Sequence, residues 1–481
     1  MPKAWPKRFP GIAVLLGVLA VSVAAPARGH TSSGMNVVVI LTDDQSNDSL
    51  PNQDPVPMPY LQSLIDDPTD HWVRFARAID NTALCCPARA TLLTGKYSHH
   101  TRVQNNEQGK NLDETKTVAE WVHAAGYRTG FVGKYLNAYP WDRGDYTPPG
   151  WDDWVAFKSP PLYFDYTLID NGTEVPYGSA EADYSTDVLA QRAVDFLDGV
   201  QSGQPFFLWF APYGPHYNTD LQWVPAPRDV GAFSGMAPLR HPDFNEADVS
   251  DKPGWVQALP LLTSEEQQQM DANREGEYET LLSVDDAVQS IVEKLRSMGA
   301  LDNTVILYLT DNGFSFGEHR WETKTCPYGE CNAIPFFVRY PGVTPFTDRR
   351  HLVSTVDVAP TIAEIAGVTP ANAVDGHSLV NLVQRNPTAW RNGLLMRWFG
   401  QPAGTDPEER DQYDPAAVTP YWAVRTPSYL YVEYDGGEKE LYDLTGAIDP
   451  KDPYETSNHA GDPAYASVQQ RLADLLAKLK G

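Results

Sequence analysis

The stretch Asn36-Val-Val-Val-Ile-Leu-Thr42, followed by Asp43-Asp44-Gln45, decides which fold the chain can adopt. An apolar run that does not alternate with polar residues is typical of a strand buried on both faces of an α/β sheet. Ligand groups in such sheets collect at the carboxyl ends of the strands. Two adjacent carboxylates repel each other unless a cation lies between them. We therefore expect a cation beside Asp43 and Asp44; a solvated turn is the alternative.

Similar apolar runs recur along the chain, separated by helical patterns. Strands are predicted at residues 127–133, 205–211, 304–310 and 336–340, and helices at 115–124, 185–200, 263–298 and 356–365. Strands that alternate with helices predict an α/β fold with a large central, mostly parallel sheet flanked by helices. Two irregular stretches interrupt the pattern: a predicted surface loop at 141–154, and a long segment at 217–262 that we expect to line a substrate pocket.

The last hundred or so residues differ in pattern from the rest of the 481-residue chain. Short strand patterns at 421–425, 429–434 and 440–442 precede an amphipathic helix at 468–479. This order predicts a small C-terminal α+β domain. We accordingly expect a catalytic domain at residues 35–385 and a subdomain at residues 386–481.

Polar residues also follow the other predicted strands. Lys134 and His216 come after the strands at 127–133 and 205–211, and Asp311-Asn312 follow the strand at 304–310. Because the carboxyl ends of parallel strands meet at one edge of a sheet, these residues should lie together. Four of the residues at strand ends offer hard oxygen ligands that suit Ca²⁺ or Mg²⁺ better than Zn²⁺: Asp43, Asp44, Asp311 and Asn312.

The stretch Asn81-Thr-Ala-Leu-Cys-Cys-Pro-Ala-Arg-Ala-Thr-Leu-Leu-Thr-Gly-Lys96 holds two of the four cysteines. After Pro87 the residues favour a helix that Gly95 can end. Cys85 then lies at a loop-to-helix junction, where backbone N–H groups and the helix dipole favour an anion, and Arg89 adds positive charge. Two small buried side chains are the alternative interpretation of the cysteine pair.

Composition restricts the environment and the partners. With 37 basic and 63 acidic residues, the net charge of −26 argues against nucleic acid as a partner.

Residues 1–27 have a basic start, a short apolar run and an A-x-A-like site, as in a cleaved signal peptide, with a membrane anchor as the alternative. We expect a secreted or periplasmic protein with no stable membrane anchor. Cys326 and Cys331 are then candidates for a small disulfide loop; two free thiols are the alternative.

The motifs resemble those of type I sulfatases. Cys85-Cys-Pro-Ala-Arg89 fits the family signature C-x-P-[SA]-R, and Leu41-Thr-Asp-Asp-Gln45 and Thr310-Asp-Asn-Gly313 resemble its two metal motifs. Within the family, several stretches are most similar to N-acetylglucosamine-6-sulfatases. They are Ala83-Leu-Cys-Cys-Pro87, Gly95-Lys-Tyr-Ser-His99, Gly133-Lys-Tyr-Leu-Asn137 and Leu281-Leu-Ser-Val-Asp-Asp286.

The resemblance implies an alkaline-phosphatase/sulfatase-like sandwich and the hydrolysis of sulfate esters, on a sulfated sugar, another glycan or an aryl sulfate. It implies that a formylglycine-generating enzyme converts Cys85 to Cα-formylglycine, whose hydrated aldehyde attacks sulfur beside a bound Ca²⁺ or Mg²⁺. The implied metal ligands are Asp43, Asp44, Asp311, Asn312 and the modified Cys85. The implied catalytic residues are Cys85, Arg89, Lys134, His216 and Lys324.

Two features depart from the family patterns, and one is the Cys326–Cys331 loop next to Lys324, which departs from the pattern of N-acetylglucosamine-6-sulfatases. Many sulfatases carry a histidine two residues after the first lysine, where this chain has Leu136. We expect substrate-side roles for His99, Asn137 and His319. Two other functions stay open: a phosphonate or phosphodiester hydrolase of the same superfamily, and a non-catalytic exported binding protein if Cys85 is unmodified. Asp285 and Asp286 are interpreted as a solvated face of the helix at 263–298.

Overall fold

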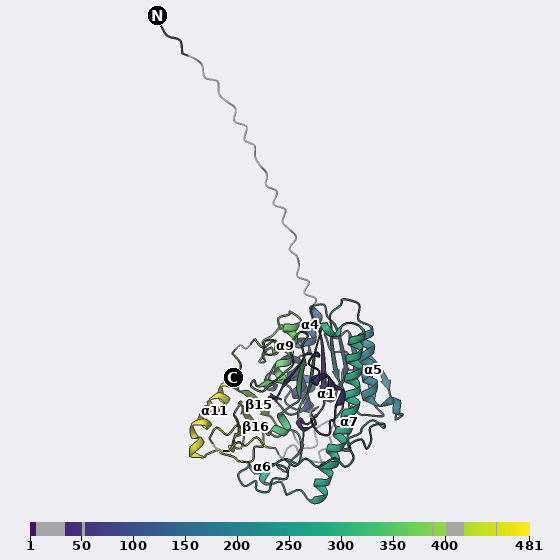
Figure 1. Ribbon diagram of the computed structural model, residues 1–481, viewed down its shortest axis with the longest axis vertical. Helices are drawn as coiled ribbons and strands as arrows, with labels where there is room; N and C mark the ends of the chain where they lie inside the picture. Colours follow the sequence, from purple (N-terminus) through teal and green to yellow (C-terminus); the bar gives the residue numbers. More distant parts are fainter. Residues whose placement is uncertain (6–33, 51–52, 387–388, 401–417, 449) are drawn as a thin grey trace. The chain divides into compact units, whose positions relative to one another are not determined.

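The structure is a computed structural model that describes residues 1–5, 34–50, 53–386, 389–400, 418–448 and 450–481. Most of the predicted signal peptide, residues 1–27, lies outside the described residues and stays a prediction. The fold lies within Gly34–Gly481 (Figure 1). Among the described residues, no helix has both the length and the apolar character needed to cross a bilayer.

Ten strands of the described residues form one large sheet, in the order β13-β2-β12-β9-β1-β8-β4-β5-β6-β7. The five strands from β9 to β5 in that order run parallel to one another, and antiparallel pairs flank them. The strands are β1 Asn36–Thr42, β2 Trp72–Phe75, β4 Arg128–Gly133, β5 Asp153–Phe157, β6 Thr167–Asp170, β7 Thr173–Pro176, β8 Phe206–Ala211, β9 Thr304–Thr310, β12 Phe336–Arg339 and β13 Phe346–Asp348.

The register of the central strands aligns their carboxyl ends. Thr42 at the end of β1 is level with Thr310 at the end of β9, and Gly133 at the end of β4 is level with Ala211 at the end of β8. Strands β1, β8 and β9 are buried along their whole length, as their unalternating sequences predict. The predicted α/β fold is confirmed, and the residues after these strands come together at one edge.

Helices cover both faces of the large sheet (Figure 1). Helices α1, α5 and α7 pack on one face, where Val38, Leu208 and Ile306 point. Helices α2, α4, α9 and α10 pack on the other. The helices are α1 Pro59–Asp66, α2 Cys85–Thr94, α3 Ser98–Thr101, α4 Val118–Ala124, α5 Ser185–Asp198, α6 Gly254–Gln257, α7 Ser264–Ser297, α8 Gly329–Asn332, α9 Val358–Ile365, α10 Val380–Val383 and α11 Ala466–Leu479.

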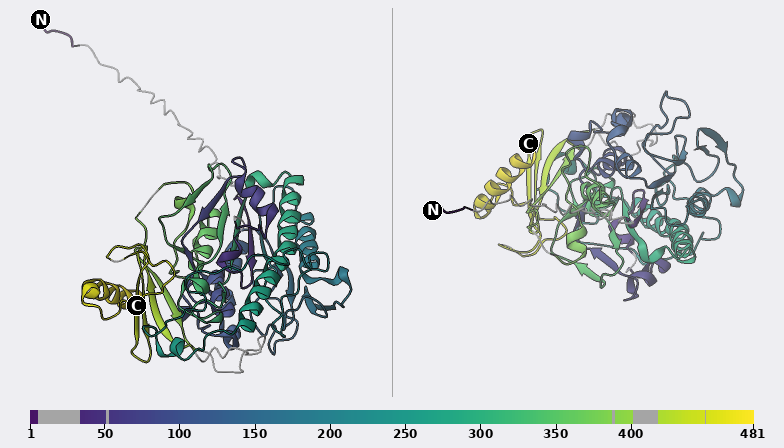
Figure 2. Two further views of the ribbon diagram at one scale, coloured as in Figure 1. Left: turned by 60° about the horizontal axis from the view of Figure 1, so that its bottom comes forward. Right: turned by 90° about the horizontal axis from the view of Figure 1, so that it is seen from above.

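A second sheet near the C-terminus is antiparallel, in the order β15-β16-β17-β18 among the described residues. Its strands are Leu394–Trp398, Tyr421–Arg425, Tyr429–Tyr434 and Lys439–Asp443. Helix α11 packs on this sheet through Val468, Leu472 and Leu476 (Figure 2). Short strand pairs complete the structure: β3 Ala78–Ile79 with β14 Val353–Ser354, and β10 Ser315–Phe316 with β11 Glu322–Thr323. The domain boundary at residue 386 stays a prediction.

The interpretation of residues 141–154 as a surface loop is wrong at its end. Trp154 belongs to β5 and is fully buried, because its ring stacks on Phe131 with the ring centroids 4.4 Å apart. The sequence predicts a loop here because the Pro, Gly and Asp residues just before the strand are typical of loops. The segment at 217–262 is irregular as predicted, apart from α6 and an isolated bridge at Phe244.

Helix α7 begins as its sequence predicts but buries a residue that we expected to be exposed. Thr263 and Glu266 form a capping box at its start. Asp285, interpreted as part of a solvated face, is buried and accepts hydrogen bonds from the backbone N–H groups of Tyr60 (2.6 Å) and Leu61 (2.8 Å) in α1. Because these N–H groups belong to the first turn of α1, they have no partner within that helix. Asp286 beside it is exposed, as predicted.

We predict that Asp285→Ala lowers the free energy of unfolding at pH 7.5 by about 1–3 kcal/mol, because two buried N–H groups lose their acceptor. The matched control is Asp286→Ala, which removes only an exposed ion pair with Arg228 and should cost about 0–1 kcal/mol. Denaturant unfolding measures both variants. Equal losses for the two would contradict the anchoring role of Asp285.

Candidate active site

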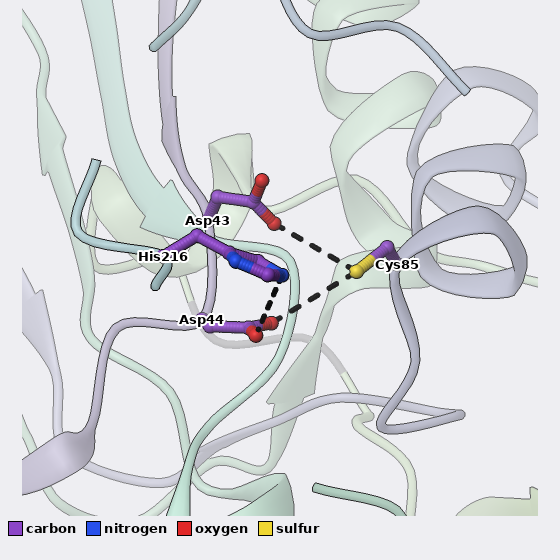
Figure 3. Close-up of side chains that lie close together, drawn as sticks. All are labelled: Asp43, Asp44, Cys85 and His216. Atoms are coloured by element: carbon purple, nitrogen blue, oxygen red, sulfur yellow. Dashed lines mark hydrogen bonds and ion pairs between the residues drawn. The ribbon is translucent and has the colours of Figure 1, made fainter. Parts of the chain in front are cut away.

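Four side chains converge at the carboxyl edge of the parallel strands (Figure 3). Asp43, Asp44, Cys85 and His216 each offer one potential ligand atom, and these atoms all lie within 4.8 Å of one another. All four residues are buried. Asp43 and Asp44 follow β1, Cys85 is the first residue of α2, and His216 lies in the turn after β8. The edge predicted from the strand ends therefore gathers an acidic cluster around one cysteine.

Asp311 and Asn312, which follow β9, border the same cluster. Asp311 Oδ1 accepts a hydrogen bond from the backbone N–H of Asp44 (3.2 Å), and Asn312 Nδ2 donates to Asp44 Oδ1 (2.7 Å). Asn312 Oδ1 is buried and accepts no hydrogen bond from the described residues. Since buried amide oxygens are normally satisfied, this atom is suited to bind a cation.

Three basic side chains surround the carboxylates. Arg89 Nε donates to Asp311 Oδ2 (2.8 Å), and its Nη2 lies 3.4 Å from Asp43 Oδ1. Lys134 Nζ lies 2.6 Å from Asp43 Oδ2, and Lys324 Nζ lies 2.8 Å from Asp44 Oδ2. Arg89 also donates to the backbone carbonyl of Lys134 (2.6 Å), so it ties α2 to the segment after β4.

The electrostatics of these carboxyl groups differ from one to the next. Burial acts to raise the pKa of Asp43, but Lys134 and Arg89 outweigh it and hold the pKa well below its usual range. Burial and the Asp43 carboxylate raise the pKa of Asp311. Three basic side chains thus balance the three carboxylates in number, and the carboxylate oxygens remain hard ligands that suit a divalent metal ion.

Cys85 lies between the acids and the bases. Its Sγ is 3.8 Å from Asp43 Oδ1 and 3.9 Å from Asp44 Oδ1, and Lys324 Nζ and Lys134 Nζ lie 3.2 Å and 3.7 Å from it. Burial raises the pKa of the Cys85 thiol well above its usual value, despite the two lysines. The electropositive environment that we expected from the helix start and Arg89 is therefore offset by burial and the two aspartates.

Cys86 faces away from this cluster. Its Sγ accepts a hydrogen bond from the backbone N–H of Asn137 (3.0 Å), and its own N–H donates to Asn106 Oδ1 (3.0 Å). The two adjacent cysteines thus have separate surroundings, and only Cys85 lies beside the acidic and basic groups.

His216 has a defined orientation. Its Nδ1 lies 2.6 Å from the carbonyl oxygen of Tyr217, so Nδ1 carries the hydrogen of that bond, and Nε2 lies 3.2 Å from Asp44 Oδ2. Burial acts to lower the pKa of His216, but Asp44 and Asp43 outweigh it and raise the pKa. Nε2 is thus the nitrogen available to exchange a proton at the cluster.

The other residues that the sequence singles out make contacts outside the cluster of Asp43, Asp44, Cys85 and His216. His99 stacks on Tyr97 and meets Trp422 edge-on, and His319 contacts Glu246 (2.8 Å). Leu136 is buried in the apolar core. Cys326 and Cys331 form a disulfide next to the segment that carries Lys324. The substrate-side roles of His99, Asn137 and His319 stay predictions.

The sequence did not reveal one supporting residue, Glu277 in α7. Its carboxylate is fully buried and accepts hydrogen bonds from the backbone N–H of Ser46 (2.7 Å) and from Ser46 Oγ (2.9 Å). These bonds hold the turn that follows Asp43 and Asp44. The available signal was the spacing of Glu277 with Leu281 and Val284, which places a carboxylate on the apolar stripe of a helix.

The fold and the site together define a hydrolase with an alkaline-phosphatase-like fold. The model of the sulfatase family matches residues 35–368, and the model described as N-sulphoglucosamine sulphohydrolase, C-terminal, matches residues 317–481. Human N-acetylglucosamine-6-sulfatase is 34% identical over 93% of this chain and 85% of its own length. The chain belongs to the sulfatase family and hydrolyses sulfate esters, which confirms the resemblance seen in its motifs.

Solved structures share the fold. A protein in complex with its substrate D-glucosamine-2-N,6-O-disulfate matches with a TM-score of 0.78 and 24% identity, over 92% of this chain and 97% of that one. The phosphonate monoester hydrolase of Agrobacterium radiobacter matches with a TM-score of 0.71 and 22% identity, over 93% and 95%. Because a protein bound to a sulfated sugar and a phosphonate monoester hydrolase share this fold, the fold alone does not distinguish sulfate-ester from phosphonate-ester hydrolysis.

We predict that Glu277→Gln becomes more stable relative to the wild type as pH rises from about 4.5 to 7. Burial raises the pKa of Glu277 to about 7, so between pH 4.5 and 7 the unfolded chain loses this proton while the folded state keeps it, and the wild type loses stability as pH rises. A glutamine amide can accept from the Ser46 N–H and donate to its hydroxyl without ionising. The difference in unfolding free energy should grow by about 1–3 kcal/mol over this range. A difference that does not change with pH would contradict the prediction.

Proposed function

We propose that this sulfatase removes the 6-O-sulfate of N-acetylglucosamine-type sugars, with Cα-formylglycine made from Cys85 and a bound Ca²⁺ or Mg²⁺. The observation that carries the proposal is the position of Cys85. It begins α2 within the C-x-P-A-R signature, and its Sγ lies within 4 Å of two carboxylates and two lysines.

The residues present fit both groups that the family implies. Asp43, Asp44, Asp311 and Asn312 supply hard oxygen ligands, and the unsatisfied Asn312 Oδ1 gives the cation a ready ligand. When bound, the cation neutralises sulfate oxygens, and formylglycine supplies a hydrated aldehyde as the nucleophile. The side chain at position 85 borders the carboxylates that would hold the cation, so both groups can act on one sulfate.

The basic residues bind and orient the sulfate group. Lys134 Nζ and Lys324 Nζ approach position 85 from two segments, so they can stabilise the charge on the transferring group. Arg89 fixes the carboxylate of Asp311 and the carbonyl of Lys134, which positions the metal ligands relative to the lysine. Each group is held by rigid elements of the sheet edge, as precise catalysis requires.

His216 donates a proton to the oxygen of the leaving alcohol. Because Nδ1–H is bound to the carbonyl of Tyr217, Nε2 faces the cluster and can donate to the leaving oxygen. Lys324 Nζ lies 3.5 Å from the same Nε2, so the lysine and the histidine act on neighbouring oxygens of the ester.

The substrate is proposed from the relatives. Human N-acetylglucosamine-6-sulfatase covers almost the whole chain, and the solved structure with the glucosamine disulfate shares the fold. The net charge of −26 disfavours a highly sulfated polymer and favours a small sugar or the end of a glycan chain. His99 and Asn137 are the proposed substrate-side residues.

We further propose that residues 35–385 form the catalytic domain and residues 386–481 a C-terminal subdomain. Residues 1–27 are proposed to act as a cleaved signal peptide, which would direct the protein to a secreted or periplasmic location. Maturation would then require a formylglycine-generating enzyme as a transient partner.

We predict turnover of N-acetylglucosamine-6-sulfate by protein from the native host, and much weaker turnover of an aryl phosphate or a phosphonate monoester. Sulfate release by ion chromatography, and phosphate or phosphonate release in parallel assays, measure the comparison. Cys85→Ala is the control and should abolish turnover with the fold intact. Faster turnover of the phosphorus ester would overturn the proposal in favour of a phosphonate or phosphodiester hydrolase, and full activity of Cys85→Ala would refute the nucleophile.

A further inference from the structure

A second cluster of ligand-type side chains, two of them buried and one partly buried, lies outside the site around Cys85. Asp243, His319 and Glu330 each offer one potential ligand atom, and the three atoms lie within 4.8 Å of one another. They come from three separate segments: the irregular segment at 217–262, the turn between β10 and β11, and the short helix α8. The chain therefore brings these residues together by its tertiary fold and not by a local motif.

Four polar atoms of this cluster lack a hydrogen-bond partner among the described residues, unless the Asp243 and Glu330 carboxyl groups share a proton. Both carboxylate oxygens of Asp243, the Nε2 of His319 and the Oε2 of Glu330 are buried and unsatisfied. Asp243 is fully buried and His319 is 1% exposed. Burying a carboxylate without a partner is costly, so a native structure rarely retains two of them side by side.

Neighbouring cations do not resolve this excess of negative charge, because each is already bound to another carboxylate. Lys252 Nζ lies 3.5 Å from Glu246, and Arg274 Nη2 lies 2.9 Å from Glu318. Arg425 pairs with Glu455. These acidic residues thus have basic partners, whereas Asp243 and Glu330 face His319 and each other, with the carboxylates of Glu318 and Glu455 also nearby.

The orientation of His319 is that of a metal ligand. Its Nδ1 lies 2.8 Å from Glu246 Oε2, so Nδ1 donates to that carboxylate. This bond leaves a lone pair on Nε2, which lies 3.8 Å from Asp243 Oδ2. Metal-bound histidines commonly donate their second nitrogen to a carboxylate in this way. In a tetrahedral zinc site two ligand atoms lie about 3.4 Å apart, so a shift of a few tenths of an ångström would bring Nε2 and Oδ2 onto one ion.

We propose that Asp243, His319 and Glu330 bind a second divalent cation, of the zinc class. The imidazole nitrogen favours Zn²⁺ over Ca²⁺ or Mg²⁺, and Zn²⁺ also accepts carboxylate oxygens, in contrast to the all-oxygen set at Asp43 and Asp44. Glu246 acts as the supporting carboxylate that fixes His319. The sequence predicts a substrate-side role for His319, whereas its burial and contacts favour this structural role.

The position of the site suggests a structural role for the ion, next to the segment that carries Lys324. The turn with His319 leads through β11 to Lys324, whose backbone carbonyl accepts a hydrogen bond from Trp321 Nε1 (2.9 Å). The backbone N–H of His319 also donates to the carbonyl of Asp243 (2.8 Å). A cation here would fasten the irregular segment at 217–262 to the hairpin that precedes Lys324. The disulfide Cys326–Cys331 fixes the other side of Lys324, beside Glu330.

The test uses the full-length chain, stripped of metal with a chelator and then equilibrated with Zn²⁺ alone. Zinc bound per chain is measured by elemental analysis after dialysis. The wild type should retain one zinc ion more than Glu330→Gln, which keeps the shape of the side chain but removes its charge. The control Asp44→Asn alters only the cluster around Cys85 and should retain the ion at Asp243. Equal zinc content in the wild type and Glu330→Gln would overturn the proposal and would favour a proton shared by Asp243 and Glu330.

A second measurement needs no variant. Anomalous diffraction at the zinc edge from crystals of the zinc-loaded wild type should show a peak between Asp243, His319 and Glu330. A map without a peak there, whether or not zinc binds near Asp43 and Asp44, would overturn the proposal. This result does not depend on the sulfatase activity, so it separates the second metal site from the proposed function.

Discussion

Three buried carboxylates at one edge of the sheet, those of Asp43, Asp44 and Asp311, are the constraint on which the site depends. Removing a charged carboxylate from water costs several kcal/mol, and removing one partner of a buried ion pair costs about 3–5 kcal/mol. The chain offsets these charges with Arg89, Lys134 and Lys324, which come from three different segments. Folding of the site therefore requires these segments to assemble together.

The parallel register makes this assembly possible. Strands β1, β9, β8 and β4 end within one residue of one another, so the residues that follow each strand meet without long excursions of the chain. Helix α2 carries Cys85 on the face of the sheet opposite to α7, and Arg89, one turn further along α2, is bonded to Asp311. The buried turn after Asp44 is held from behind by Glu277 in α7. Glu277 and Cys85 thus approach the strand ends from opposite faces of the large sheet.

Much of this arrangement was predictable from the sequence, because its signals are local. The unalternating run before Asp43 predicts a central strand, and the Cys85-x-Pro87-x-Arg89 spacing indicates the family. Two kinds of feature were not predictable. Asp285 and Glu277 are polar residues whose partners lie more than 200 positions away, and nothing in the sequence nearby identifies those partners. The cluster of Asp243, His319 and Glu330 likewise exists only once an irregular segment has folded against a hairpin.

The proposed chemistry requires that the residue at position 85 is no longer a cysteine in the active protein. The most direct measurement is the mass of the peptide that spans residues 81–96, taken from protein purified from its native host. We predict a residue at position 85 that carries an aldehyde and no sulfur, with Cys86 unchanged. An intact thiol at position 85 in catalytically active protein would contradict it.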